Sequence, residues 1–526
     1  LHRRAADAIR EARPENFEAI AFHYEEAGEE ALSLEYYLKA GERAAKAYAN
    51  PEAERHFLAA LDLVDAEPER ARLLGELALV QSRQGKFELA LGRWLEGIRL
   101  YQALGEQEPM ARYYARAARA AWEAGDLRRG LALGQEGLQV LEGAPASQGL
   151  ADLLHEAGRA LYFNAKLEEA EPILRKALDM AEQTNALVVR IEALVTLGTT
   201  IPIAHPRSAQ EGKQLLDQAV QLARSKGLPD QESRALNNLG LIEAEFLADV
   251  SKTRGYYLRA AELARSTGSA ASELFYLSNA CSSAMGTGDL NWVRERLPGL
   301  LEAVQELESP GAAGEALREN NTSLVRYSGE LDTALSLARE QFELGRKTGY
   351  VLSAAVSIAE VALETRQHID EALSMVEEAS KGLEFLAPGT LLLLRSRLLI
   401  AQGDLAEARL ALEEVITRSG GHPIGRSQAG YALAQAESAV AEKDWEAARR
   451  GYAESVEFLG RAGLRWYRAR TLWDWAEALI KEAQGTALEE AQKLLDEARA
   501  EFEAMGAPIY AGRIEARLKE LNLAPS

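Results

Sequence analysis

One internal repeat constrains this chain more than any other feature of its sequence. A short turn is followed two residues on by an apolar side chain and five on by a small one, as in Gly85-Lys86-Phe87 with Ala90. Eleven such turns are separated by 36 to 43 residues, and the later ones lie at Gly125, Ala165, Arg207, Ala248, Gly288, Gly329, Gln367, Gly403, Lys443 and Thr486. A spacing of this kind is typical of arrays whose units bury their apolar faces against their neighbours.

Each repeat is predicted to be a pair of helices. Glycine at the turn accepts the left-handed conformation that ends a helix, and the Asp or Glu that often follows favours the start of the next helix. Between turns, small and bulky residues alternate on one helical stripe, as at Ala90, Trp94 and Gly97, which lets two helices pack closely. We therefore predict an all-α fold, a right-handed superhelical solenoid of about a dozen hairpins with a period near 40 residues.

The pattern weakens at two places in the chain. Residues 1–65 are predicted to form an amino-terminal helical segment that joins the array to an upstream module, and residues 66–526 are predicted to form the solenoid. Ile201-Pro202-Ile203-Ala204-His205-Pro206 is expected to be an irregular insertion, because proline interrupts helices. The chain starts at Leu1 without a methionine, so we expect it to be a piece of a longer protein.

Charge and cysteine content limit the classes of partner. The sequence has 60 Lys and Arg against 81 Asp and Glu, a net charge of −21, which repels nucleic acid and anionic lipid. Its single cysteine, Cys281, cannot form a disulfide within the chain and is expected to be a small buried hydrophobe in a reducing compartment. The apolar run at Leu391–Leu394 is far too short to cross a bilayer. We expect a soluble, cytoplasmic, monomeric fragment that binds neither nucleic acid nor membrane.

Motifs that would indicate catalysis or cofactor binding are missing from the sequence. The seven histidines are scattered, and His155-Glu156 has no second histidine at the spacing of a zinc motif. Gly212-Lys213-Gln214 lacks the glycine loop and the hydroxyl residue that cradle phosphate and magnesium. The sequence therefore predicts no enzyme, no metal and no cofactor.

Three asparagines form the candidate binding site. Asn238, Asn279 and Asn320 occur at intervals of 41 residues in the first helices of three consecutive repeats, so they should stack along the inner wall. Asparagine is unfavourable within a helix, and its amide can donate to and accept from the backbone of an extended peptide. The same inner face is predicted to carry Arg234, Asn237, Phe275, Ser282, Glu319, Ser323, Arg326 and Tyr327. The alternative is that the amides tie each hairpin to the next.

An aromatic cluster near the carboxyl end has two possible meanings. Trp466, Tyr467, Trp473 and Trp475 could form a stacking platform for a ligand, but their spacing with interleaved alanines favours the core of a helix pair. We predict the core.

The turns and stripes described above resemble the tetratricopeptide repeat superfamily over about residues 66 to 520, in a form with longer helices. Residues 1–65 contain two short segments of note, His23-Tyr24-Glu25-Glu26-Ala27-Gly28 and Tyr48-Ala49-Asn50-Pro51-Glu52-Ala53. Through these segments, residues 1–65 resemble the junction that opens the sensor region of bacterial STAND signal-transduction ATPases. That resemblance implies an inducer-binding sensor next to an upstream nucleotide-binding module. A generic protein–protein scaffold and a receptor for a small-molecule inducer remain the alternatives.

Overall fold

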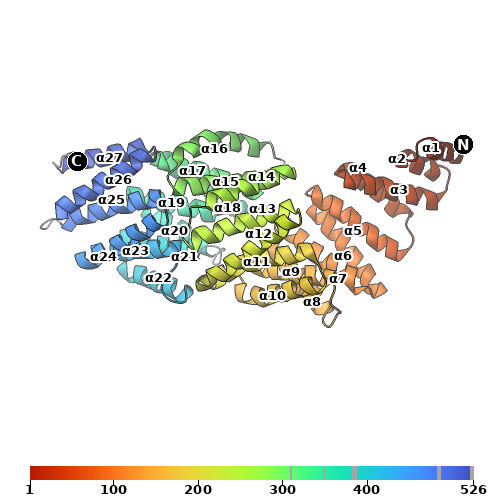
Figure 1. Ribbon diagram of the computed structural model, residues 1–526, viewed down its shortest axis with the longest axis horizontal. Helices are drawn as coiled ribbons and strands as arrows, with labels where there is room; N and C mark the ends of the chain where they lie inside the picture. Colours follow the sequence, from red (N-terminus) through yellow and green to blue (C-terminus); the bar gives the residue numbers. More distant parts are fainter. Residues whose placement is uncertain (308–310, 349–350, 382–387, 483–486, 522–526) are drawn as a thin grey trace. The chain divides into compact units, whose positions relative to one another are not determined.

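The computed structural model describes residues 1–307, 311–348, 351–381, 388–482 and 487–521. Within those residues the chain forms 27 α-helices, one short 3₁₀-helix and no β-strand, which confirms the all-α prediction. Successive helices pack side by side as antiparallel pairs (Figure 1).

In chain order the helices are α1 (His2–Ala12), α2 (Phe17–Glu25), α3 (Glu30–Lys46), α4 (Asn50–Leu63), α5 (Glu67–Arg83), α6 (Phe87–Leu104), α7 (Gln107–Glu123), α8 (Leu127–Val140), α9 (Gln148–Phe163), α10 (Leu167–Gln183), α11 (Leu187–Ala204), η1 (Pro206–Ser208), α12 (Ala209–Ser225), α13 (Pro229–Glu245), α14 (Thr253–Ser266), α15 (Ala270–Gly286), α16 (Leu290–Gln305), α17 (Gly311–Tyr327), α18 (Leu331–Thr348), α19 (Leu352–Thr365), α20 (Ile369–Ser380), α21 (Pro388–Gln402), α22 (Leu405–Arg418), α23 (Arg426–Glu442), α24 (Trp445–Arg461), α25 (Arg465–Glu482), α26 (Ala487–Ala504) and α27 (Pro508–Glu520).

The predicted turns lie where the helices end. Ten of the eleven fall between two helices of a pair, and Thr486 lies outside the described residues. Gly329 and Gly403 adopt φ values of +85° and +97°, the left-handed region expected of a residue that ends a helix. At the next helix, the Asp404 side chain accepts a hydrogen bond from the backbone N–H of Glu407 and caps α22.

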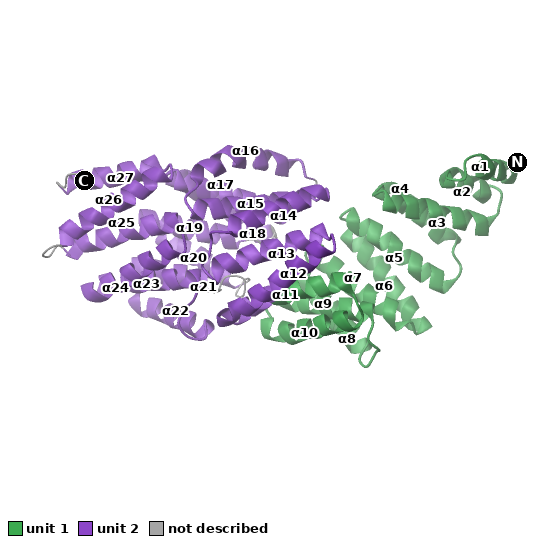
Figure 2. Cartoon of the chain, viewed as in Figure 1, with its two compact units in different colours: residues 1–197 green, residues 198–526 purple. Residues whose placement is uncertain are grey.

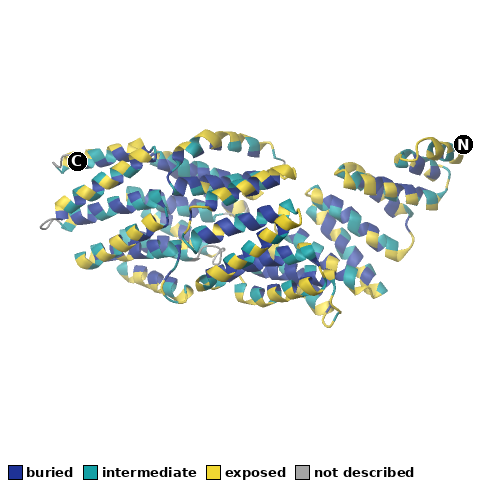
Figure 3. Ribbon diagram, in the orientation of Figure 1, coloured by how far each residue is buried: buried dark blue, intermediate teal, exposed yellow. Residues whose placement is uncertain are grey.

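The small and bulky stripe forms the contact between paired helices. Ala90, Trp94 and Gly97 on α6 are all buried. Buried and exposed stretches alternate along the helices (Figure 3). A Cβ atom at Gly97 would lie 2.5 Å from the ring of Tyr113 on α7, so the glycine makes room for that ring. Close approach of this kind is what the alternating stripe predicts.

The chain divides into two compact units, residues 1–197 and 198–526 (Figure 2). In unit 1, one core cluster joins Ala6, Ile20 and Phe57 of the amino-terminal helices to Leu73 and Leu77 of α5. Residues 1–65 therefore pack as a continuation of the array within this unit. Their predicted role as a connection to an upstream module stays a prediction.

Helix α11 corrects one expectation. The segment from Ile201 was predicted to be irregular, but the helix continues through Pro202 to Ala204. Pro202 cannot donate to the carbonyl of Gly198, and the backbone of Gly212 on α12 packs against that carbonyl. A Cβ atom at Gly212 would lie 2.5 Å from this oxygen. Glycine at that position thus permits the helix contact that accompanies the interior proline.

Helix α11 is also the one described helix that is long and apolar enough to match a membrane span, with a mean hydropathy of 1.6 over 18 residues. Of that window, 61% is buried inside the protein, and the helix carries the charged residues Arg190 and Glu192. A buried core helix meets the same criterion, so this is weak support for membrane insertion.

Candidate functional site

The three predicted asparagines lie on α13, α15 and α17, the first helices of neighbouring hairpins in unit 2. Asn238 and Asn279 are half-buried, whereas Asn320 is only 1% exposed. Equal spacing in the sequence therefore places the three on successive helices. The third side chain does not lie on a solvated wall, because the protein encloses it.

The amide of Asn320 links α17 to α15 through both its nitrogen and its oxygen. Its Nδ2 donates to the backbone carbonyl of Ser278 at 2.8 Å, and its Oδ1 accepts from the Ser282 hydroxyl at 2.7 Å. These bonds join the middles of two helices and tie one hairpin to the next, as the alternative interpretation of the asparagines expects. A buried amide with both functions satisfied stabilises the contact between the two hairpins.

A second amide link joins α15 to α13. Asn279 Nδ2 donates to Asn237 Oδ1 at 2.8 Å, and Asn237 Nδ2 donates to Asn238 Oδ1 at 3.2 Å. All three side chains keep part of their surface exposed, and Ser282 beyond them is exposed. We call Asn237, Asn238, Asn279 and Ser282 the asparagine row. Its amides are partly accessible and already aligned from one helix to the next.

The other predicted site residues fall into two groups. Arg234, Phe275, Glu319 and Ser323 are half-buried, as a lining residue would be. Arg326 and Tyr327 are 5% and 3% exposed, because helices near the carboxyl end of the chain cover them. In this conformation a ligand on the asparagine row cannot reach these two side chains. Whether the remaining residues bind a ligand stays a prediction.

The cover over the end of α17 is formed by α25 and α27. The ring of Tyr327 stacks on Trp466 with centroids 3.9 Å apart. The Tyr510 hydroxyl donates to the backbone carbonyl of Arg326 at 2.9 Å, and Arg513 Nη2 donates to the carbonyl of Gly329 at 2.8 Å. Figure 1 shows α27 beside α17, although nine helices lie between them in the chain.

Two further contacts extend this closure in unit 2. A Cβ atom at Gly288, in the turn after α15, would lie 2.5 Å from the side chain of Met505. Near α13, Arg426 Nη1 forms an ion pair with Glu245 Oε1 at 3.1 Å. Hairpins that are far apart in sequence therefore touch, in contrast to an open array in which each repeat meets only its neighbours.

Ion pairs between first helices accompany the closure. Arg326 lies 2.7 Å from Glu360 of α19, and Arg397 forms a two-pronged contact with Glu437, with both distances 2.8 Å. Burial alone would raise the pKa of Glu437, but the Arg397 guanidinium outweighs it and lowers that pKa. The Glu319 carboxyl has a raised pKa, because burial and the nearby Glu360 outweigh a hydrogen bond from Ser353. Arg326 and Arg397 are thus each paired with a carboxylate of a neighbouring first helix.

The predicted aromatic core is confirmed at Trp466, which is 0% exposed and packs edge-on against Phe502 and Tyr510. Sequence analysis did not foresee that this core also covers α17. No local pattern reports a contact between residues so far apart, although the bulky Met505, Ile509 and Tyr510 next to Gly506 mark an unusually apolar turn.

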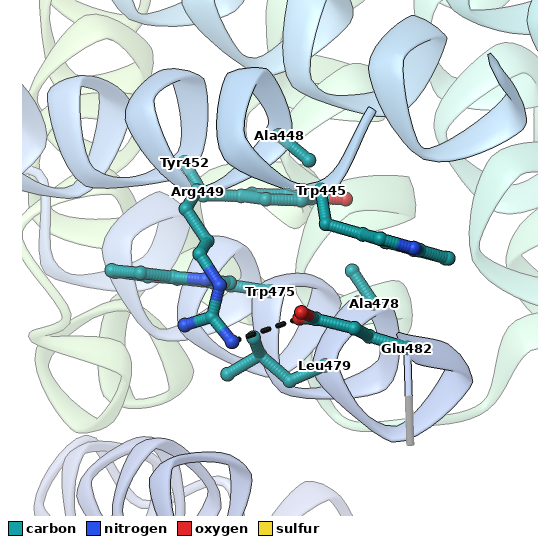
Figure 4. Close-up of a pocket in the computed structure, with 8 residues that line it drawn as sticks. All are labelled: Trp445, Ala448, Arg449, Tyr452, Trp475, Ala478, Leu479 and Glu482. Carbon is teal, nitrogen blue, oxygen red and sulfur yellow. Dashed lines mark hydrogen bonds and ion pairs between the residues drawn. The ribbon is translucent and has the colours of Figure 1, made fainter. Parts of the chain in front are cut away.

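A shallow hollow of about 160 Å³ lies between α24 and α25 (Figure 4). The rings of Tyr452 and Trp475 are parallel within 7°, with centroids 6.2 Å apart, and Arg449 pairs with Glu482 at 2.8 Å across the opening. Ligand pockets usually enclose about 300 to 1,000 Å³. The hollow is therefore better described as packing between two helices.

In unit 1, Asp152, His155 and Glu156 bring potential metal ligands within 4.8 Å of one another. His155 Nε2 contacts the Thr196 hydroxyl at 3.0 Å, and Arg119 lies 3.7 Å from Glu156. A guanidinium already compensates this negative charge, so the group fits a buried ionic cluster better than a metal centre.

The segment Gly212-Lys213-Gln214 has no phosphate-binding geometry. Gly212, Lys213 and Gln214 lie inside α12, so their backbone N–H groups are within a helix and not in a loop. Lys213 Nζ pairs with Asp217 at 2.8 Å and with Glu243 at 3.2 Å. This lysine is held by carboxylates of its own chain.

No protein-family model matches the chain, and no curated protein matches its sequence. Its fold is similar to the crystal structure of the APC/C hetero-tetramer Cut9–Hcn1, with a TM-score of 0.51, 12% identity and coverage of 91% of both chains. Lower TM-scores relate it to a Rap protein complexed with Competence and Sporulation Factor (0.41; 15% identity; 72% of this chain, 99% of that chain) and to yeast Tom70 (0.32; 13%; 86% and 97%). The fold assignment rests on the first of these three structural similarities. In fold, the chain is a tetratricopeptide-like helical-repeat solenoid.

Proposed function

We propose that the chain binds a peptide or protein segment in an extended conformation along the asparagine row of unit 2. The observation that carries this proposal is the alignment of Asn238, Asn237 and Asn279, which are half-buried and joined by hydrogen bonds across two helices. Each amide keeps at least one donor N–H and one acceptor lone pair beyond these bonds, which matches the donor and acceptor of a peptide backbone. The half-buried Arg234, Phe275 and Ser323 offer charge, an aromatic face and a hydroxyl to side chains of the ligand.

We further propose that binding serves sensing. The similarity of residues 1–65 to the junction of STAND ATPases supports a cytoplasmic sensor arm, joined to an upstream nucleotide-binding module of the same protein. In that arrangement the ligand is the inducer. This proposed role requires no catalysis by the chain itself.

A scaffold function is the second candidate. The Cut9–Hcn1 structure is a hetero-tetramer, so a chain of similar fold assembles there with a different protein. A scaffold would hold its partner constantly and would not transmit a signal.

Peptide selection tests the proposal. Random-sequence peptides displayed on phage are selected on the immobilised chain, and their affinities are compared for the wild type, Asn238→Ala and Asn279→Ala. Loss of one amide contact should weaken binding about two- to tenfold. Asn321→Ala is the matched control, because its side chain points about 100° away from that of Asn320 on the same helix.

Two results would contradict peptide binding at this place. One is selection of peptides whose affinity does not change in the two row variants. The other is an equal loss of affinity in Asn321→Ala. A failure to select any peptide, together with tight binding of a small organic molecule, would favour the inducer receptor instead.

A further inference from the structure

We propose that the contact of α25 and α27 with the end of α17 is a reversible latch that limits how far a ligand on the asparagine row can extend along α17. This inference rests on the proposed binding at the asparagine row, because it concerns regulation of that same site. The latch consists of Tyr327 against Trp466, Tyr510 on the Arg326 carbonyl, Arg513 on the Gly329 carbonyl, and Ile509 against Gly329.

The latch covers residues of the candidate site. Arg326 and Tyr327 belong to the predicted inner face that carries the asparagines, and they lie one to two helical turns beyond Asn320 on α17. With the latch closed, their side chains are 5% and 3% exposed. A ligand that extends along α17 to Tyr327 must therefore displace α25 and α27, whereas Arg326 is also held by Glu360 of α19.

The chemistry of the latch allows it to open without unfolding a hairpin. Two of its acceptors are backbone carbonyls at the end of α17, which water can satisfy as readily as Tyr510 and Arg513 do. Trp466 and Tyr510 also pack against Phe502 of α26, and α25 to α27 share the buried stripe of Ala491, Leu495 and Ala498, so these three helices can move as one body. Opening the latch leaves that packing intact.

The closed latch also contains an unsatisfied group. The indole N–H of Trp466 is buried and has no hydrogen-bond partner among the described residues. A buried donor without an acceptor disfavours the closed state relative to an open one in which water reaches it. The Tyr327 and Tyr467 hydroxyls, 3.4 Å apart, form a long contact that adds little. The unsatisfied indole therefore favours opening, whereas the buried apolar cluster that Tyr327 and Trp466 share favours the closed form, so the open form should be the minor one.

Single-molecule fluorescence transfer measures the latch directly, without a ligand. Dyes are attached to the full chain at Glu330→Cys and Lys519→Cys, both exposed positions, with the buried Cys281 changed to Ala. A second pair, Glu330→Cys and Gln367→Cys, reports on the turns of two consecutive hairpins and is the control. The latch is weakened by Tyr510→Phe with Arg513→Gln.

The expected result is a minor population of low transfer efficiency in the latch pair. It should grow about four- to a hundredfold relative to the closed form in the double variant, since each of the two lost hydrogen bonds changes an equilibrium about two- to tenfold. The control pair should not change. One population that is the same in wild type and variant overturns the latch, and so does a parallel change in both pairs, which would mean general loosening.

The selected peptides separate this inference from the proposed function. The peptides should bind the double variant more tightly than the wild type, by the same factor as the gain in open population when that form is rare. Opening without any selectable peptide would refute peptide binding and leave the latch standing. Peptides that depend on Asn279 but bind both latch states equally would refute the latch as a regulator and keep the proposed function.

Discussion

Tyr327 and Trp466 stack with their ring planes 27° apart, and this contact joins α17 to α25 across the interior of unit 2. The two residues belong to hairpins that are not neighbours in the array. Stability in this unit is therefore not a sum over adjacent hairpins alone, as it would be for an open solenoid. The predictions below use pairs of similar residues inside and outside such contacts.

Gly329 and Gly403 occupy equivalent turns with similar positive φ, but only Gly329 faces the latch. A Cβ atom at Gly329 would lie 2.9 Å from Ile509 Cβ, whereas nothing lies within 4 Å of one at Gly403. Gly403→Ala should lower the free energy of unfolding by about 1 kcal/mol through backbone strain. Gly329→Ala should cost about 1 to 3 kcal/mol more, because the methyl group crowds Ile509. Urea unfolding of both variants measures this, and equal losses would contradict the contact.

Asn320 and Asn321 are adjacent on α17 but differ in environment. Asn320→Ala removes two hydrogen bonds and leaves the Ser278 carbonyl and Ser282 hydroxyl without that partner, which should cost about 1 to 3 kcal/mol. Asn321→Ala, at a half-buried position, should change stability by less than about 0.5 kcal/mol. Thermal melting distinguishes the two. If Asn320→Ala melts like the wild type, its amide does not tie the hairpins together.

The ion pairs Arg397–Glu437 and Arg409–Glu442 allow a second comparison. The first is largely buried, with side chains 18% and 6% exposed, and the second is more exposed, at 62% and 35%. Glu437→Gln should destabilise the protein by about 3 to 5 kcal/mol, since it leaves a buried guanidinium without its counter-charge. Glu442→Gln should cost less than about 1 kcal/mol. Similar losses in urea unfolding would show that water screens both pairs.

Asp152 in unit 1 should make stability depend on pH. Burial raises the pKa of its carboxyl from 3.8 to about 6, with Arg116 opposing. Because the folded state holds this proton more tightly, the wild type should lose stability relative to Asp152→Asn as pH rises from about 4 to about 6. The loss should reach about 1 to 3 kcal/mol and then level off. Urea unfolding at several pH values checks this, and a difference that stays constant with pH would contradict it.

The repeat is what the sequence predicts best. Turns such as Gly85, Gly288 and Gly403 separate helices where the pattern expects them, since turn chemistry and stripe periodicity are local properties. Local reasoning was wrong at Pro202, because the glycine that accommodates this proline lies on the next helix. Asn320 was correctly placed on its helix, but its enclosure follows from the spacing between hairpins, which no single repeat encodes. Contacts such as Tyr510 with Arg326 depend on the summed rotation of every hairpin between them.

The contact of α25 and α27 with α17 also limits the number of repeats that unit 2 can hold. Each hairpin between α17 and α25 contributes a fixed rotation and rise, so Tyr510 meets the Arg326 carbonyl only when the total has one value. Duplicating or deleting one hairpin there would leave Trp466 and Tyr510 facing solvent. The closing contact therefore fixes the number of hairpins between these two helices. Gain or loss of a repeat between them would break the contact, whereas the open part of a solenoid tolerates such a change.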